Sequence, residues 1–167
     1  TTLMLYNPST RKKAFYVEYI LKNVVVSHND IAELRLNMLS TDLREDFDKI
    51  SIKVNLDESV NDLRAWAHGP LWGNIKLSDN KDYALFTIED YSKATGVDIR
   101  MTFDKDLINT EKTTNVDMLD KIIEEETILA DEANKERNSA RALLENEKKI
   151  DKIITILSGA YIISLVV

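Results

Sequence analysis

The stretch Lys49-Ile50-Ser51-Ile52-Lys53-Val54-Asn55-Leu56 decides the fold class of this chain. Apolar residues occupy every second position from Ile50, and the residues between them are polar. Successive side chains of a strand point to opposite faces of a sheet, so this alternation is typical of a half-buried strand. Few helices would show it. The sequence therefore predicts a β-strand here.

The same alternation recurs on both sides of this stretch. Further strands are predicted over residues 15–23, 32–38, 63–67, 73–77, 83–89 and 97–103. For residues 32–38 a helix is an alternative, because Leu, Glu, Arg and Met favour helices. Turn-forming residues separate several of the segments, at 27–30, 57–58, 78–80 and 95–96. Many short strands at this spacing predict a mainly β fold, an antiparallel β-sandwich of the immunoglobulin-like class.

A long helix is predicted after the strands. Residues 116–152 contain neither Gly nor Pro and are rich in Ala, Glu, Leu and Lys. Asn115 or Thr114 is the expected cap, and one apolar stripe is expected to pack on the β-rich head. An unbroken helix of this length would reach roughly 55 Å, so an interruption over residues 134–139 is an alternative.

The last residues, Ile153 to Val167, carry no charge. As a helix they would reach roughly 22 Å, short of the roughly 30 Å hydrocarbon core of a bilayer. We interpret them as the start of a truncated transmembrane helix, so the membrane is a predicted partner. The expected organisation is a head over residues 1–112, a charged helical stalk over 113–152 and the membrane helix from 153. Further sequence is expected before Thr1 and after Val167.

Composition narrows the class of protein. With 167 residues and 44% apolar content, the chain is expected to form one domain with a single core. The formal charge of -7 argues against a nucleic-acid partner, because the phosphates of nucleic acids are bound by clustered Lys and Arg side chains. The absence of cysteine excludes disulfides and thiolate metal sites.

The segment from Trp66 to Gly73 is the strongest candidate for an interaction loop. It combines two large aromatic residues with turn-forming ones, and its candidate residues are Trp66, His68, Gly69, Pro70 and Trp72. The alternative is a structural turn with both tryptophans packed inward, which is favoured because large aromatics usually serve burial first. His68 has no His, Cys or carboxylate at a spacing suited to a shared metal ion.

Other polar groups have plainer interpretations. Residues 79–82 lack the ligand spacing of a calcium loop and predict a hairpin turn. The three glutamates at 124–126 point to different faces of a helix and are interpreted as a solvated surface. Asp104 and Asp106 could act as acid and base only if they shared a cleft. The sequence has no Gly-x-Ser-x-Gly elbow, so nothing supports a nucleophilic serine. Together these interpretations predict no catalytic, cofactor-binding or metal-binding residue.

Several of these segments together resemble the YciQ-like family of predicted bacterial membrane proteins, which is classed as a domain of unknown function. The resemblance rests on residues 16–25, 29–34 and 50–54, on residues 63–71 with their His-Gly-Pro turn, and on Gly73-Asn74-Ile75, residues 97–103 and residues 124–137. It implies an extracytoplasmic β-rich head, membrane helices and a location in the bacterial cell membrane. It implies no catalytic residues.

We therefore expect a non-enzymatic extracytoplasmic domain that serves in interaction or sensing at the cell envelope, with an unknown envelope protein or ligand as partner. One alternative is a hydrolase or transferase of envelope polysaccharide or peptidoglycan, with Trp66 and Trp72 stacking on sugars and Asp or Glu as acid and base. A second alternative is a structural scaffold that self-associates through its helix.

Overall fold

The computed structural model of the chain describes residues 14 and 16–166, and of residues 155–166 it describes the backbone alone. Within these residues the chain forms strands, one 3-10 helix and one long α-helix. In chain order they are β1 (Val25–Ser27), β2 (Ala32–Leu39), β3 (Phe47–Asn55), β4 (Arg64–His68), β5 (Asn74–Leu77), β6 (Tyr83–Tyr91), β7 (Val97–Phe103), η1 (Lys105–Leu107) and α1 (Leu119–Val166).

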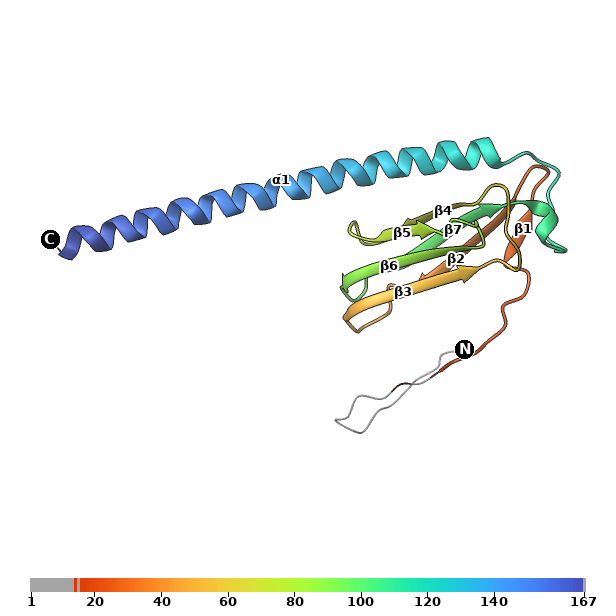
Figure 1. Cartoon of the computed structure of the whole chain (residues 1–167), viewed down its shortest axis with the longest axis horizontal. Helices are drawn as coiled ribbons and strands as arrows, with labels where there is room; N and C mark the ends of the chain where they lie inside the picture. The colour runs from red at the N-terminus through yellow and green to blue at the C-terminus, as the bar shows by residue number, and fades with distance from the viewer. Residues whose placement is uncertain (1–13, 15, 167) are drawn as a thin grey trace.

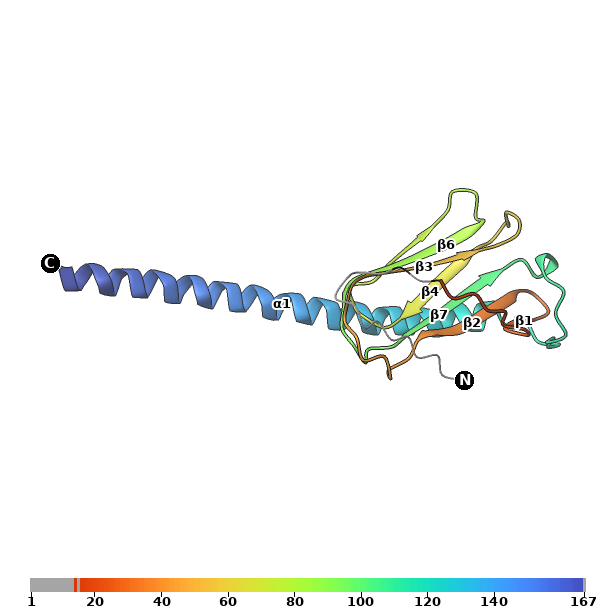
Figure 2. The ribbon, with the colours of Figure 1, turned by 90° about the horizontal axis from the view of Figure 1, so that it is seen from below.

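The strands form two antiparallel sheets. One sheet has the strand order β1-β2-β7-β4 and the other has the order β3-β6-β5. Figure 2 shows the two sheets with α1 running along the first of them. The fold is therefore mainly β with a long C-terminal helix, as the sequence predicts. The immunoglobulin-like class and the domain boundaries at 112 and 152 stay predictions.

The hydrophobic core lies between the two sheets. Its buried members come from both, and they are Ala32, Leu34, Ile52, Leu63, Ala84, Phe86, Ile88, Tyr91, Val97, Ile99, Met101 and Phe103. Alternation places most of these residues on the inward face of their strands. Leu63 comes just before β4, and Tyr91 at the end of β6 falls out of phase with the alternation. The sheets are thus held together mainly by apolar burial.

Strand β7 differs from the others because both of its faces are covered. Ile99, Met101 and Phe103 point into the core, while Arg100 and Thr102 are also buried on the opposite face. Figure 1 shows α1 passing over that outer face and continuing well beyond the strands. The central strand is therefore packed between a sheet and a helix.

Most predicted strands are confirmed, including residues 32–38, where β2 forms rather than a helix. Residues 79–82 lie in the predicted hairpin turn between β5 and β6. The strand predicted over residues 15–23 is wrong for its described part, since residues 16–23 belong to no strand and β1 begins at Val25. Phe15 lies outside the described residues. Alternation shows that a segment suits a sheet, but a strand also needs a neighbour to pair with.

Helix α1 begins later than predicted and runs without interruption through residues 134–139. Its first backbone N–H groups, those of Met118 and Leu119, are bound at 2.9 Å by the carboxylate of Asp30. The cap therefore comes from the turn between β1 and β2, and the predicted caps Asn115 and Thr114 are wrong. A sequence pattern finds caps beside the helix, whereas this one is distant in sequence.

In the described part of the chain, no helix is both long enough and apolar enough to cross a membrane. The truncated transmembrane helix predicted from Ile153 stays a proposal. The backbone of these residues, as far as Val166, continues α1.

Two isoleucines test where the core lies. Ile99 is fully buried on β7, whereas Ile75 on β5 is 41% exposed. We expect Ile99→Ala to lower the free energy of unfolding by about 2–5 kcal/mol, because it removes buried methyl groups and leaves a cavity. Ile75→Ala is the matched control and should cost clearly less. Urea denaturation measures both values, and equal losses would contradict the assigned core.

Candidate functional site

The most unusual feature of the structure is a group of charged side chains between the outer face of β7 and helix α1. Arg100 has only 6% of its side chain exposed. Its Nε atom donates to Glu33 at 2.6 Å, and its Nη1 atom donates to Glu125 and Glu126, each at 3.0 Å. One guanidinium thus joins a glutamate of the sheet to two glutamates of the helix.

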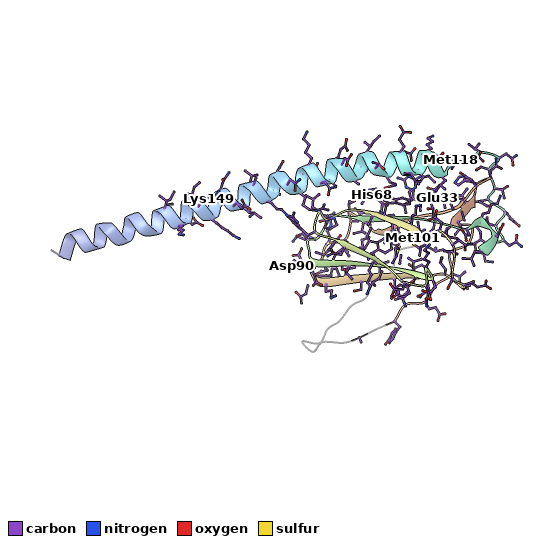
Figure 3. The ribbon with its side chains drawn as sticks, turned by 45° about the horizontal axis from the view of Figure 1, so that its top comes forward. Glu33, His68, Asp90, Met101, Met118 and Lys149 are labelled. Carbon is purple, nitrogen blue, oxygen red and sulfur yellow. The ribbon has the colours of Figure 1, made fainter. Side chains whose placement is uncertain are left out.

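Two histidines extend this group at either side. Nε2 of His68 lies 3.2 Å from Glu126, whose side chain is 2% exposed. Nε2 of His28 lies 3.0 Å from Glu33, and its Nδ1 lies 2.7 Å from the hydroxyl of Thr114. We call His28, Glu33, His68, Arg100, Glu125 and Glu126 the Arg100 cluster. Figure 3 shows Glu33 and His68 beneath α1, while Met101, the neighbour of Arg100 on β7, lies between the sheets.

Strand register explains how these residues meet. Arg100 lies opposite Trp66 on β4 and opposite Arg35 on β2, and Glu33 lies two pairs further along, opposite Thr102 and therefore on the same face. Paired residues of neighbouring strands share one face of the sheet. The inward positions are taken by Ile99 and Met101, so Arg100 must face outward, toward α1.

Electrostatics stabilises the charged forms in the cluster. Burial disfavours the charge of Arg100, but its hydrogen bonds to Glu125 and Glu126 and the nearby charge of Glu33 outweigh this effect and raise its pKa. The hydrogen bond from Arg100 in turn lowers the pKa of Glu125, against a smaller opposing effect of burial. The cluster is therefore an ionic contact between sheet and helix.

Three further contacts attach α1 to the head. At its start the helix is capped by Asp30 of the β1–β2 turn. Further along, Nε of Arg137 donates to the carbonyl oxygen of Leu71 at 2.8 Å, and the guanidinium of Arg141 lies 5.7 Å from the ring centre of Trp72. The helix is thus held at both ends of its path over the sheet, with the Arg100 cluster between them.

The hydrogen-bonding capacity of the cluster is used within the protein. Three carboxylates already accept hydrogen bonds from Arg100, so the guanidinium is occupied within the protein. Among the described residues, no set of His and carboxylate side chains is placed to hold a metal ion. These charged hydrogen bonds fix helix α1 against the sheet.

The structure brings the predicted interaction-loop residues close to α1. Trp66 is half-buried on β4 beside Arg100, and His68 pairs with Glu126. Trp72 remains 48% exposed in the β4–β5 connection. The carbonyl of Pro70 accepts a hydrogen bond from Gly73, which closes the turn. Whether this loop binds a partner stays a prediction.

Gly69 in this loop has a packing role. A Cβ atom at this position would lie 2.9 Å from the carbonyl oxygen of Gly96 and 3.3 Å from a methyl group of Val97. The approach of the two backbones therefore requires glycine here.

Sequence reasoning missed the Arg100 cluster itself. The sequence predicts Glu126 on a solvated surface, and this prediction is wrong because Glu126 is buried against Arg100 and His68. One signal was available: Arg100 is a charged residue within a strand whose alternate positions are apolar. Nothing in the spacing could show that a helix would cover the other face.

The β-rich head matches a known protein family. Residues 4–103 match the N-terminal domain of predicted membrane proteins known as DUF2207. The match covers more than half of the chain, and the chain belongs to this family, whose function is unknown. The narrower YciQ-like resemblance stays an expectation. Comparisons with curated proteins and with solved structures find no match.

Removing the central charge tests the cluster. We expect Arg100→Leu to lower the free energy of unfolding by about 3–5 kcal/mol, because Glu33 and Glu126 would stay buried without a countercharge. Replacing Arg100, Glu33 and Glu126 together by leucine should recover most of that loss. Chemical denaturation measures both. A loss below about 1 kcal/mol for Arg100→Leu would contradict a buried ionic attachment.

The helix cap gives a pH-dependent prediction. Burial alone would raise the pKa of Asp30, but hydrogen bonds from Met118 and Leu119 and the nearby His28 lower it below its ordinary value of 3.8. A carboxylate whose pKa is lowered by folding stabilises the folded state at any pH above its pKa in the unfolded chain. This stabilisation is lost as the pH falls through the lower pKa of the folded state.

We therefore expect Asp30→Ala to cost about 1 kcal/mol at neutral pH, the usual value of a helix cap. The difference from the unchanged protein should shrink as pH falls below about 4. Thermal denaturation across pH measures this, with Asp79→Ala in the exposed β5–β6 turn as control. A difference that persists at low pH would contradict the role of the charge.

Proposed function

We propose that the chain is a non-enzymatic, membrane-tethered interaction or sensing domain of the bacterial envelope, with its head on the extracytoplasmic side. In this proposal α1 is the connector that holds the head at a fixed position relative to the bilayer. The observation that supports it most strongly is the attachment of α1 through the Arg100 cluster. A connector that transmits position or force must be fixed to the domain it serves.

The part of α1 beyond the head fits the same proposal. Its side chains from Arg141 to Ile154 are exposed, including the apolar Leu143, Leu144 and Ile150. Figure 3 places Lys149 on this projecting part. Membership of a family of predicted membrane proteins supports membrane association. The uncharged residues from Ile153 onward are the proposed tether.

The contact surface that we propose for a partner includes Trp72. Its exposed ring offers flat apolar area, of the kind enriched at binding sites. The hydrolase alternative would need Trp66 and Trp72 as free sugar platforms. Trp66 is half-buried in β4, so the two free platforms that this alternative needs are not both present, and this observation favours the interaction role.

Cysteine labelling tests the proposed location, because the sequence contains no cysteine. We expect Ser92→Cys, an exposed position after β6, to react with a membrane-impermeant maleimide in intact bacteria. Labelling only after lysis would contradict an extracytoplasmic head. The unchanged protein is the control and should not be labelled.

In the same cells, a photo-crosslinking residue at position 72 should give a discrete adduct with an envelope component. The same residue at position 92 is the matched control and should not give that adduct. Loss of both the adduct and the extracellular labelling would leave the proposed function without support.

A further inference from the structure

Residues 16–23 are an unusual surface feature, and we call them the leading segment. They belong to no strand or helix, yet they carry a run of apolar side chains that face solvent. Tyr16 is 99% exposed and Ile20 is 83% exposed, and Val17, Tyr19 and Leu21 are also exposed. Exposed apolar residues gathered in one segment commonly mark an interaction site.

The leading segment borders an apolar groove at the open edge between the two sheets. The groove has a volume of about 370 Å³, and Tyr19 and Leu21 line it together with residues of β2 and β3. Glu18, Ile20 and Lys22 are not among the lining residues. Alternate residues thus differ in surroundings, as they do in a strand with one covered face.

We propose that the leading segment pairs in antiparallel fashion with the leading segment of a second copy of this chain, with Ile20 opposite Ile20. In this register Glu18 of one copy lies opposite Lys22 of the other, and Tyr19 lies opposite Leu21. Each opposite-charge pair occurs twice because the pairing is symmetric. Opposite charges directly across an antiparallel pair are stabilising, and like charges there are destabilising.

The charge pattern selects this occupant. In the sequence Tyr16-Val17-Glu18-Tyr19-Ile20-Leu21-Lys22, the acidic and basic residues lie at equal distances on either side of Ile20. The segment is therefore complementary to itself when reversed. Its backbone forms no strand ladder within the described residues, so its N–H and C=O groups can join a new ladder. The residues from Tyr16 to Val24 also match the usual length of a strand.

Charge reversal tests the pairing. We expect the chain to form dimers in a mild detergent by analytical ultracentrifugation, with Glu18→Lys or Lys22→Glu raising the dissociation constant about tenfold, since each places two like-charge pairs across the dimer. The double change Glu18→Lys/Lys22→Glu should restore the original affinity. Both residues are exposed, so circular dichroism should show an unchanged fold. A monomer at all concentrations, or a dimer that none of the three variants alters, would overturn the proposal.

Cysteine crosslinking tests the register separately. Two residues directly opposite each other have Cα atoms about 4.5–5.5 Å apart, a distance that a disulfide spans. Ile20→Cys should therefore give a disulfide-linked dimer on mild oxidation, and the chain has no other cysteine. Tyr16→Cys is the control, because its two copies would lie roughly 27 Å apart. Equal crosslinking of the two variants, or none for Ile20→Cys, would overturn the register.

Discussion

The attachment of helix α1 to the head depends on the guanidinium of Arg100. It meets Glu33 from the sheet on one side and Glu125 and Glu126 from the helix on the other. Burying any of these charges without a partner would be costly, so each favours the position in which all are paired. A geometry of this kind specifies one placement of the helix along the sheet. Sliding α1 by a single turn would move Glu125 and Glu126 away from Arg100 and His68.

Few described apolar side chains of α1 are completely buried in this attachment. Among the side chains of α1 that the structure describes, Ile122 is the apolar one that is fully buried, and Glu126 is buried beside it. The core between the sheets differs from this contact, because its buried residues are aliphatic and aromatic. The molecule therefore uses non-directional burial to build the head and directional hydrogen bonds to orient the helix. Such a contact favours one specific placement of the helix more than it adds to stability.

Much of the head could be predicted from the sequence because alternation reports burial on one face of a strand. Strands such as β3 and β7 carry that pattern clearly. The leading segment carries it too but forms no strand, because alternation reports the suitability of a segment and not the presence of a neighbour. Pairing partners are set by topology, which a local pattern does not contain.

The site was harder to predict for a related reason. The sequence predicts a solvated surface for Glu126, because the three consecutive glutamates at 124–126 point to different faces of a helix. Its burial depends on Arg100, which lies 26 positions earlier in the sequence. The helix cap shows the same limit, since Asp30 lies 88 positions before Met118. Ionic and capping contacts between distant segments leave no periodic signal.

Amide hydrogen exchange gives the most direct measurement of the central claim, which is that α1 is fixed to the head by the Arg100 cluster. If it is, amides near Ile122 and Glu126 should exchange about as slowly as those of β7, because they open only when the head does. Amides of the projecting residues 142–154 should exchange much faster. Equal and fast exchange along the whole of α1 would contradict the account, since it would mean that the helix is not held against the sheet.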